Sequence, residues 1–202
     1  MITSMCNSYE HTIVITNRHL VQGDFLKQLE KVTKLHPHAL ILREKDLTDD
    51  AYESLAKKVF DLCEREDITF FLHTKIEIAR KIGCQNIHLS IPVLKGLSET
   101  EKKALTEDFC EISISCHSME DVEIAMAGGA TQIILGTIFE TECKKGVLGK
   151  GVEFVREICQ KCPLPVYAIG GMNLQRLHLV IDAGAAGCCM MSGFMQTTKP
   201  LQ

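Results

Sequence analysis

The chain has 202 residues, of which 46% are hydrophobic and 24% are charged, and its formal net charge at pH 7 is −4. This composition is ordinary for a globular protein and predicts a single domain over residues 1–202. The small negative charge, without any basic tract, argues against nucleic acid or an acidic membrane surface as a partner. No signal-peptide pattern or bilayer-length apolar run is present, so we expect a cytoplasmic protein without a membrane partner.

Short runs rich in β-branched and other apolar residues recur along the chain and predict eight strands. Several are apolar at successive positions, which is typical of parallel strands covered on both faces. The expected strands are Thr12–Thr16, Ala39–Leu42, Thr69–Leu72, Asn86–Leu89, Glu111–Ser115, Gln132–Leu135, Val166–Ile169 and Gly187–Met191.

Segments with apolar residues at helical spacing lie between these strands. The start of the second helix at Asp49 and Asp50 suits an amino-terminal cap. Ser118, with Asp121 three residues later, resembles a capping box. The expected helices are Phe25–Lys34, Ala51–Glu64, Ile76–Ile82, Ser118–Ala127, Val152–Cys159 and Leu174–Ala183.

This alternation of strands and helices favours an α/β fold of the (β/α)₈ barrel type over an open doubly wound sheet. After the last strand only Phe194–Gln202 remain, so we expect the final helix to be short or missing. That side of the barrel would then be open to another subunit, and a homodimer is a possible assembly.

The ten cysteines do not form a metal-binding pattern. Only Cys159 and Cys162 have a ligand-like spacing, and no second such pair accompanies them. Cys188 and Cys189 are adjacent, so they should point to opposite faces of a strand. We therefore expect reduced thiols and no metal site.

Two glycine-bearing turns follow the last two expected strands. Gly170 and Gly171 end one strand, and Met191, Ser192 and Gly193 end the next. Because glycine has no Cβ, a ligand can approach the main-chain amides closely. The loops after strands seven and eight of such a barrel are a common phosphate site. We therefore predict that the amides of Gly170, Gly171, Met191 and Ser192 bind a phosphate.

Other polar residues fall at the expected carboxyl ends of strands. Arg43 and Lys45 follow the second strand and suit an anionic substrate. Ser115 ends the fifth strand, where its hydroxyl could donate to a ligand. His117 lies two residues later and could act as an acid or base, but a single histidine beside a helix start more often has a structural role. The loop after the sixth strand places Thr141 and Lys144 where they could contact phosphate oxygens.

Five segments, in this order along the chain, resemble the thiamine phosphate synthase superfamily, especially its thiazole tautomerase (TenI) branch. They are LREK at Leu42–Lys45, SCHSMEDVEIA at Ser115–Ala125, GTIFETECKKG at Gly136–Gly146, PVYAIGGM at Pro165–Met172 and AGAAGCCMMSG at Ala183–Gly193. The resemblance implies a barrel that binds a thiazole phosphate. Synthases join it to a magnesium-bound pyrimidine diphosphate, whereas the tautomerases move a proton on the thiazole ring.

The chain departs from both branches. Synthases place Asn-Asp after the third strand, where this chain has His73 and Thr74, and a second Asp shortly after the fourth, where it has Ser90–Val93. Magnesium favours carboxylate ligands, so synthase activity should be impaired. The tautomerases carry a histidine where this chain has Thr137, whose hydroxyl titrates far from neutrality. His73 or His117 could take its place.

Three hypotheses follow. The leading one is a tautomerase-like enzyme that binds a thiazole carboxylate phosphate and requires no cofactor. The second is thiamine phosphate synthase, which alone would need Mg²⁺ and the pyrimidine diphosphate. The third is a weakened relative that binds a thiazole or thiamine phosphate and regulates or carries it. The candidate catalytic residues are His73, Thr137 and Lys144, and the candidate substrate-binding residues are Arg43, Lys45, Ser115, Thr141, Gly170, Gly171, Met191 and Ser192.

Overall fold

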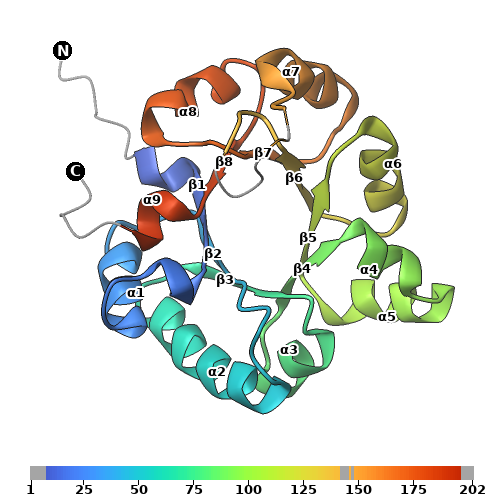
Figure 1. Ribbon diagram of the computed structural model, residues 1–202. Coiled ribbons are helices and arrows are strands. Elements are labelled where there is room, and N and C mark those ends of the chain that lie inside the picture. The colour runs from blue at the N-terminus through green and yellow to red at the C-terminus, as the bar shows by residue number, and fades with distance from the viewer. Residues whose placement is uncertain (1–7, 142–145, 147, 197–202) are drawn as a thin grey trace.

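Eight parallel strands close into a barrel in which each strand pairs with the next and β8 pairs with β1 (Figure 1). The structure is a computed structural model that describes residues 8–141, 146 and 148–196. The predicted α/β barrel is therefore confirmed, with strand bounds shifted by at most one residue. The strands are β1 (Thr12–Ile15), β2 (Ala39–Leu42), β3 (Thr69–His73), β4 (Asn86–Ser90), β5 (Glu111–Cys116), β6 (Gln132–Gly136), β7 (Val166–Ile169) and β8 (Gly187–Met190).

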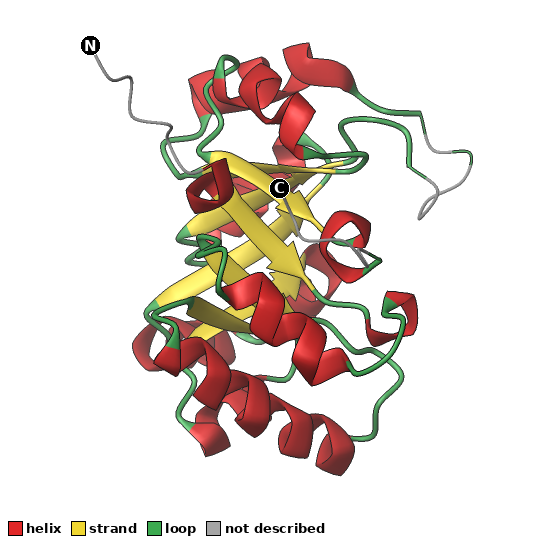
Figure 2. Cartoon of the chain, turned by 90° about the vertical axis from the view of Figure 1, so that its left-hand side faces the viewer, coloured by secondary structure: helices red, strands yellow, loops and turns green. Residues whose placement is uncertain are grey.

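Helices surround the strands on the outside of the barrel (Figure 2). The expected helices are confirmed as α1 (Phe25–Thr33), α2 (Asp49–Arg65), α3 (Ile76–Ile82), α6 (Met119–Ala127), α7 (Gly151–Lys161) and α8 (Leu174–Ile181). The predicted cap of α2 at Asp49 and Asp50 was wrong. Thr48 is the N-cap residue, and its side chain accepts a hydrogen bond from the main-chain N–H of Ala51. Ser118 caps α6 as predicted, but the Asp121 carboxylate accepts from His117 N rather than closing a box with Ser118.

The sequence prediction missed elements that bury few apolar residues. They are the 3₁₀ helices η1 (Ser8–His11) and η2 (Arg18–Leu20) and the helices α4 (Ile91–Gly96) and α5 (Glu99–Asp108). Only Leu105 is buried in α5, so this helix has no apolar stripe. Its signal is the capping box, in which Ser98 and Glu101 each bond the other's main-chain N–H.

The final described helix, α9, spans only Ser192–Met195, which confirms the expected short last helix. Phe194 and Met195 are buried within the chain itself. The side chain of Gln28 on α1 donates to the carbonyl of Phe194 at 2.6 Å. The homodimer stays a prediction.

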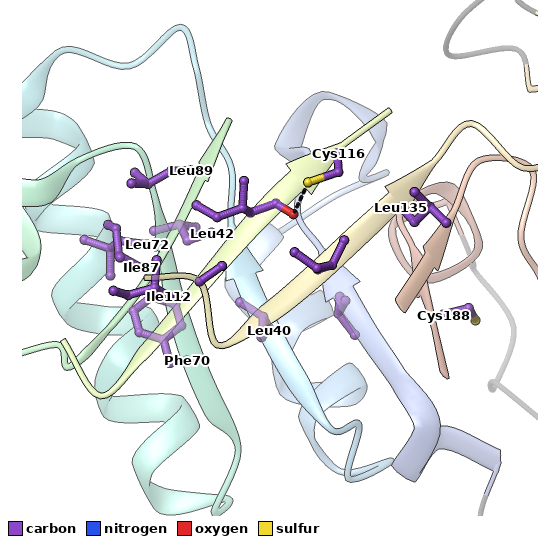
Figure 3. Close-up of a cluster of buried hydrophobic side chains, with 14 of the residues drawn as sticks. Leu40, Leu42, Phe70, Leu72, Ile87, Leu89, Ile112, Cys116, Leu135 and Cys188 are labelled. Carbon is purple, nitrogen blue, oxygen red and sulfur yellow. Dashed lines mark hydrogen bonds between the residues drawn. The ribbon is translucent and has the colours of Figure 1, made fainter. Parts of the chain in front are cut away.

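Alternate strand residues divide the core into two layers. The outer layer lies between strands and helices, and Figure 3 shows part of it, including Leu40, Leu72 and Ile87. The inner layer fills the barrel and contains Ile13, Ile15, Ala39, Ile41, Phe71, Ile134, Tyr167 and Cys189. Cys188 belongs to the outer layer, so the predicted divergence of Cys188 and Cys189 is confirmed. The described cysteines, which exclude Cys6 and Cys143, are all free thiols. Among the helices that the structure describes, none is long and apolar enough to cross a membrane.

The hydroxyl of Tyr52 on α2 joins the ends of β2 and β3, where the candidate site begins. It donates to the carbonyl of Leu42 at 2.6 Å and accepts from the main-chain N–H of His73 at 3.2 Å. Burial raises the pKa of Tyr52, so the phenol stays protonated and keeps its donor. The residue is 1% exposed, which leaves no water to replace either bond.

Tyr52→Phe should therefore lower the free energy of unfolding by about 1–3 kcal/mol, because it leaves buried main-chain groups without this partner. Urea denaturation measures the loss. Tyr167→Phe is the matched control, since the hydroxyl of this tyrosine makes no hydrogen bond within the described part of the chain, and its loss should change stability far less. Equal losses in the two variants would contradict the role of the Tyr52 hydroxyl.

Gly187 marks a close approach at the seam where β8 meets β1. A Cβ at this position would lie 2.0 Å from the carbonyl oxygen of His11, a main-chain atom. Gly187→Ala should lower the free energy of unfolding by about 1–3 kcal/mol, because the backbone must move apart. Gly96→Ala is the control, since its Cβ would meet nothing within 4 Å, and it should leave stability unchanged or raised.

Candidate active site

The predicted site residues that the structure describes lie beyond or at the carboxyl ends of their strands, and therefore at one mouth of the barrel. Arg43 and Lys45 follow β2, His73 ends β3, Ser115 is the penultimate residue of β5, and Thr137 follows β6. Thr141 lies farther along the loop after β6 and is half-buried. Lys144 lies outside the described residues, so its assignment stays a prediction.

The two glycine turns follow neighbouring strands. Ile169 of β7 pairs with Cys189 of β8, so Gly170 and Gly171 leave the barrel beside Met191 and Ser192. Gly170 and Gly171 have φ values of 102° and 60°, which L side chains rarely adopt. The adjacency on which the predicted phosphate site depends is present, while phosphate binding itself stays a prediction.

These glycines also have a packing role. A Cβ on Gly170 would lie 2.5 Å from Cγ2 of Thr137, and one on Gly171 would lie 2.5 Å from the carbonyl of Glu140. Main-chain bonds from Ile138 N to Ile169 O and from Phe139 N to Gly170 O fasten the two loops together. The two glycines therefore allow the loop after β6 to pack closely against this turn, independently of any bound ligand.

Arg176 on α8, which sequence reasoning missed, supports the same turn. Its guanidinium donates to the carbonyl of Gly171 at 2.5 Å and stacks 4.6 Å from the ring centroid of Phe139. The cation therefore lies beside the predicted phosphate turn. An arginine on a helix that follows a Gly-Gly turn is the signal that could have found it.

Glu44 lies in sequence between Arg43 and Lys45, the two cations that follow β2. It is buried at 2% exposure and accepts hydrogen bonds from the Thr16 hydroxyl at 2.8 Å and from Arg18. The Arg18 guanidinium also binds Asp46, and this contact, with His19, holds the pKa of Asp46 well below its usual range. The carboxylate between Arg43 and Lys45 in sequence is thus engaged by the segment that follows β1.

Two imidazoles lie together on the β3–β5 side of the mouth. The rings of His73 and His88 are 5.6 Å apart and tilted by 35°. His88 is 4% exposed, and its Nδ1 and Nε2 lie 2.9 Å from the Ser113 hydroxyl and 2.8 Å from the Ser115 hydroxyl. Sequence reasoning missed His88. Its signal was the alternation of Asn86, His88 and Ser90 with outward-facing apolar residues.

Both imidazoles are neutral at pH 7. Burial, followed by the charges of Arg43, Lys45 and Lys75, lowers the pKa of His73 to about 4. Burial, followed by His73 and Arg43, lowers the pKa of His88 to about 3. The charge of Arg43 disfavours a second proton on both rings. A neutral imidazole can accept or donate a proton, so the mouth holds groups suited to acid–base chemistry.

The two other polar candidates are held by the main chain. Thr137 is buried at 6% exposure, and its carbonyl accepts from Lys150 N. The Nδ1 of His117 lies 2.6 Å from the carbonyl of Gly136, so this nitrogen carries the proton and donates it there. The structural role expected for His117 fits this contact.

The donors at the mouth do not fit a magnesium diphosphate site. The ends of β3 and β4 carry imidazole and hydroxyl groups where Mg²⁺ would require carboxylates. Within residues 8–141, 146 and 148–196, no three His, Cys, Asp or Glu side chains are grouped to hold a metal ion. A surface groove lies between α1 and α2 and is lined by Leu26, Glu30, Lys58, Asp61, Leu62 and Arg65, none of which is a predicted site residue.

The lowered pKa values predict a pH-dependent stability. Between pH 4 and the ordinary histidine pKa of 6.5, the unfolded chain binds a proton that folded His73 does not. The free energy of unfolding should therefore rise with pH across this window, by up to about 3 kcal/mol from His73. Urea titrations of the wild type and His73→Gln measure this, and the variant should show the smaller rise. An identical rise in both proteins would contradict the burial of a neutral His73.

Comparison with known proteins agrees with this architecture. A family model described as thiamine monophosphate synthase matches residues 12–194. The thiamine-phosphate synthase of Coprothermobacter proteolyticus is 30% identical over 180 residues, which cover 89% of this chain and 84% of that protein. The thiamine-phosphate synthase of Clostridium acetobutylicum is 29% identical over 195 residues, covering 95% of this chain and 89% of that one.

A solved structure, thiamine phosphate pyrophosphorylase from Pyrococcus furiosus, has the same fold. It superposes with a TM-score of 0.81 at 22% identity and covers 95% of this chain and 90% of its own. The closed barrel, the order of its strands and the family match over residues 12–194 agree, and the chain belongs to the thiamine monophosphate synthase family.

Proposed function

We propose that this protein binds a thiazole carboxylate phosphate at the barrel mouth and moves a proton on its ring, as a thiazole tautomerase-like enzyme of thiamine biosynthesis. The observation that carries the proposal is the neutral pair His73 and His88, at the mouth where the family's synthases place magnesium carboxylates. Such a tautomerase requires no cofactor.

The distribution of charge supports a substrate with two anionic groups. The phosphate would bind the amides of Gly170, Gly171, Met191 and Ser192, and Thr141 and Lys144 would reach its oxygens. Arg43 and Lys45, beyond β2, would attract the carboxylate. Ser115 would contact the ring from the β5 side. Ile169 and Met191, which pack on the apolar inner core, would support its other face.

The proton transfer would fall to His73. The substrate's negative charge would offset that of Arg43 and Lys45, which raises the pKa of His73 from about 4 toward the range of an effective base. The imidazole would remove one proton from the substrate, the freed electron pair would enter the ring, and a proton would return at a second atom. Nothing is oxidised or reduced. Thr137 would then shape the site rather than carry the proton.

Thiamine-phosphate synthase is the second candidate, favoured by the printed names of the relatives. It would condense a pyrimidine diphosphate with a thiazole phosphate and release diphosphate, with Mg²⁺ as the cofactor. The imidazole and hydroxyl groups at the ends of β3 and β4 weigh against it. A protein that binds the phosphate without turnover is the third candidate.

The test is incubation with the non-aromatic thiazole tautomer, with aromatisation followed by ultraviolet absorbance. Wild type should exceed the protein-free rate, and His73→Gln should lose about 10²–10⁴-fold, the usual contribution of a general base. His117→Gln should retain most of the rate, because its Nδ1 is held by the Gly136 carbonyl.

Other outcomes identify the alternatives. Diphosphate release that depends on Mg²⁺, without aromatisation, would favour the synthase. Thermal stabilisation by the thiazole phosphate without either reaction would favour the binding protein. A larger loss in His117→Gln than in His73→Gln would contradict the assignment of the base.

A further inference from the structure

Thr74 has an unusual conformation directly after His73. Its φ is 62°, in the left-handed region that β-branched residues rarely adopt. Its main-chain N–H donates to the carbonyl of His88 at 2.9 Å, so the turn is tied to β4 as well as to β3. Backbone conformations of this kind persist where surrounding contacts hold them, and they concentrate at functional sites.

The Thr74 hydroxyl touches two atoms of His73. It donates to the His73 carbonyl at 2.7 Å, and its oxygen lies 3.2 Å from the His73 Nδ1. A hydroxyl has one hydrogen, and a carbonyl oxygen can only accept. With its hydrogen on the carbonyl, the hydroxyl oxygen can only accept from Nδ1. With both contacts made as hydrogen bonds, this arrangement requires the imidazole proton on Nδ1.

We propose that Thr74 is a positioning residue that fixes His73 as the Nδ1–H tautomer, which leaves the unprotonated Nε2 to accept the substrate's proton. This inference rests on the proposed function for the role of Nε2, while the tautomer is inferred from the contacts of the Thr74 hydroxyl. Nδ1 is protonated at the outset, so a proton gained at Nε2 is the proton that can be returned to the substrate.

The neighbouring groups leave Nε2 open. Both nitrogens of His88 are taken by Ser113 and Ser115, so this ring has no hydrogen bond to offer His73. Within the described residues, no hydrogen bond involves the Nε2 of His73.

The charges that face His73 act in one direction. Arg43 and Lys45 lie on the β2 side and Lys75 precedes α3, and all three disfavour a second proton on the ring. His88 on β4 is neutral beside it. In the protein without substrate, His73 therefore holds one proton, and the contact with the Thr74 hydroxyl favours Nδ1 as the nitrogen that carries it.

The test is long-range ¹H–¹⁵N NMR of histidine-labelled protein at pH 7, which distinguishes a protonated ring nitrogen from an unprotonated one. Spectra of His73→Gln assign the His73 signals. The wild type should show the Nδ1–H tautomer. Thr74→Ser keeps the hydroxyl and should retain it, while Thr74→Val keeps the branched shape without the hydroxyl and should shift the signals toward the Nε2–H form.

An Nε2–H tautomer in the wild type, or unchanged signals in Thr74→Val, would overturn the proposal. The His88 signals report whether each variant is folded, because they depend on Ser113 and Ser115 rather than on the hydroxyl. If Thr74→Val does not fold, the tautomers of the wild type and Thr74→Ser decide.

Kinetics then separate this inference from the proposed function. If the aromatisation assay is positive, Thr74→Val should lower kcat by about tenfold or more with little change in KM, and Thr74→Ser should recover it. An equal loss in both variants would overturn the positioning role. If the wild type shows the Nδ1–H tautomer without aromatisation, the proposed function fails and the assignment of the tautomer stands.

Discussion

The packing of β4 against β5 inside the barrel depends on hydrogen bonds to one buried imidazole, that of His88. A nitrogen of His88 left without a partner would cost about 1–3 kcal/mol, because no water reaches it to compensate. Ser113 and Ser115 supply both partners because alternate residues of a strand face the same side. A one-residue slip of β5 would place Ile112 and Ile114 there instead. The His88 network therefore specifies the register of β4 and β5 as well as the chemistry of the mouth.

The second constraint on the mouth is the placement of the Glu44 carboxylate after β2. Glu44 lies between two cations in sequence, yet its carboxylate is buried against Thr16 and Arg18. If that carboxylate faced His73, it would stabilise the imidazolium and raise the pKa. The charged groups that do shift the pKa of His73 are Arg43, Lys45 and Lys75, all cations. The charges that act on His73 are therefore cationic while its imidazole is neutral, an environment that favours an anionic ligand beside it.

The barrel could be predicted from sequence because its strands are short apolar runs between helices with clear apolar stripes. Helix α5 could not, since Leu105 is its only buried residue and apolar spacing carries no signal there. The mouth could also be predicted, because the carboxyl ends of parallel strands meet at one end. What sequence could not give is how side chains pair across strands. Glu44 lies within the quoted LREK segment, but its partners Thr16 and Arg18 are more than twenty residues away in sequence. His88 likewise acquires its role only from the register of β5.

Gly170 and Gly171 show how a sequence motif can specify the scaffold more firmly than the reaction. Their Cβ atoms would collide with Thr137 and with the main chain of Glu140, so packing of the β6 loop requires glycine whichever reaction the barrel performs. The same demand does not apply at the end of β3, where the chain turns through a strained Thr74 and presents an imidazole. Residues there can change without loss of the barrel, as is general for sites carried on a common fold. The difference between metal-assisted condensation and proton transfer should therefore be sought at the ends of β3 and β4, and in the His73–His88 pair, rather than in glycine turns that the packing of the β6 loop requires.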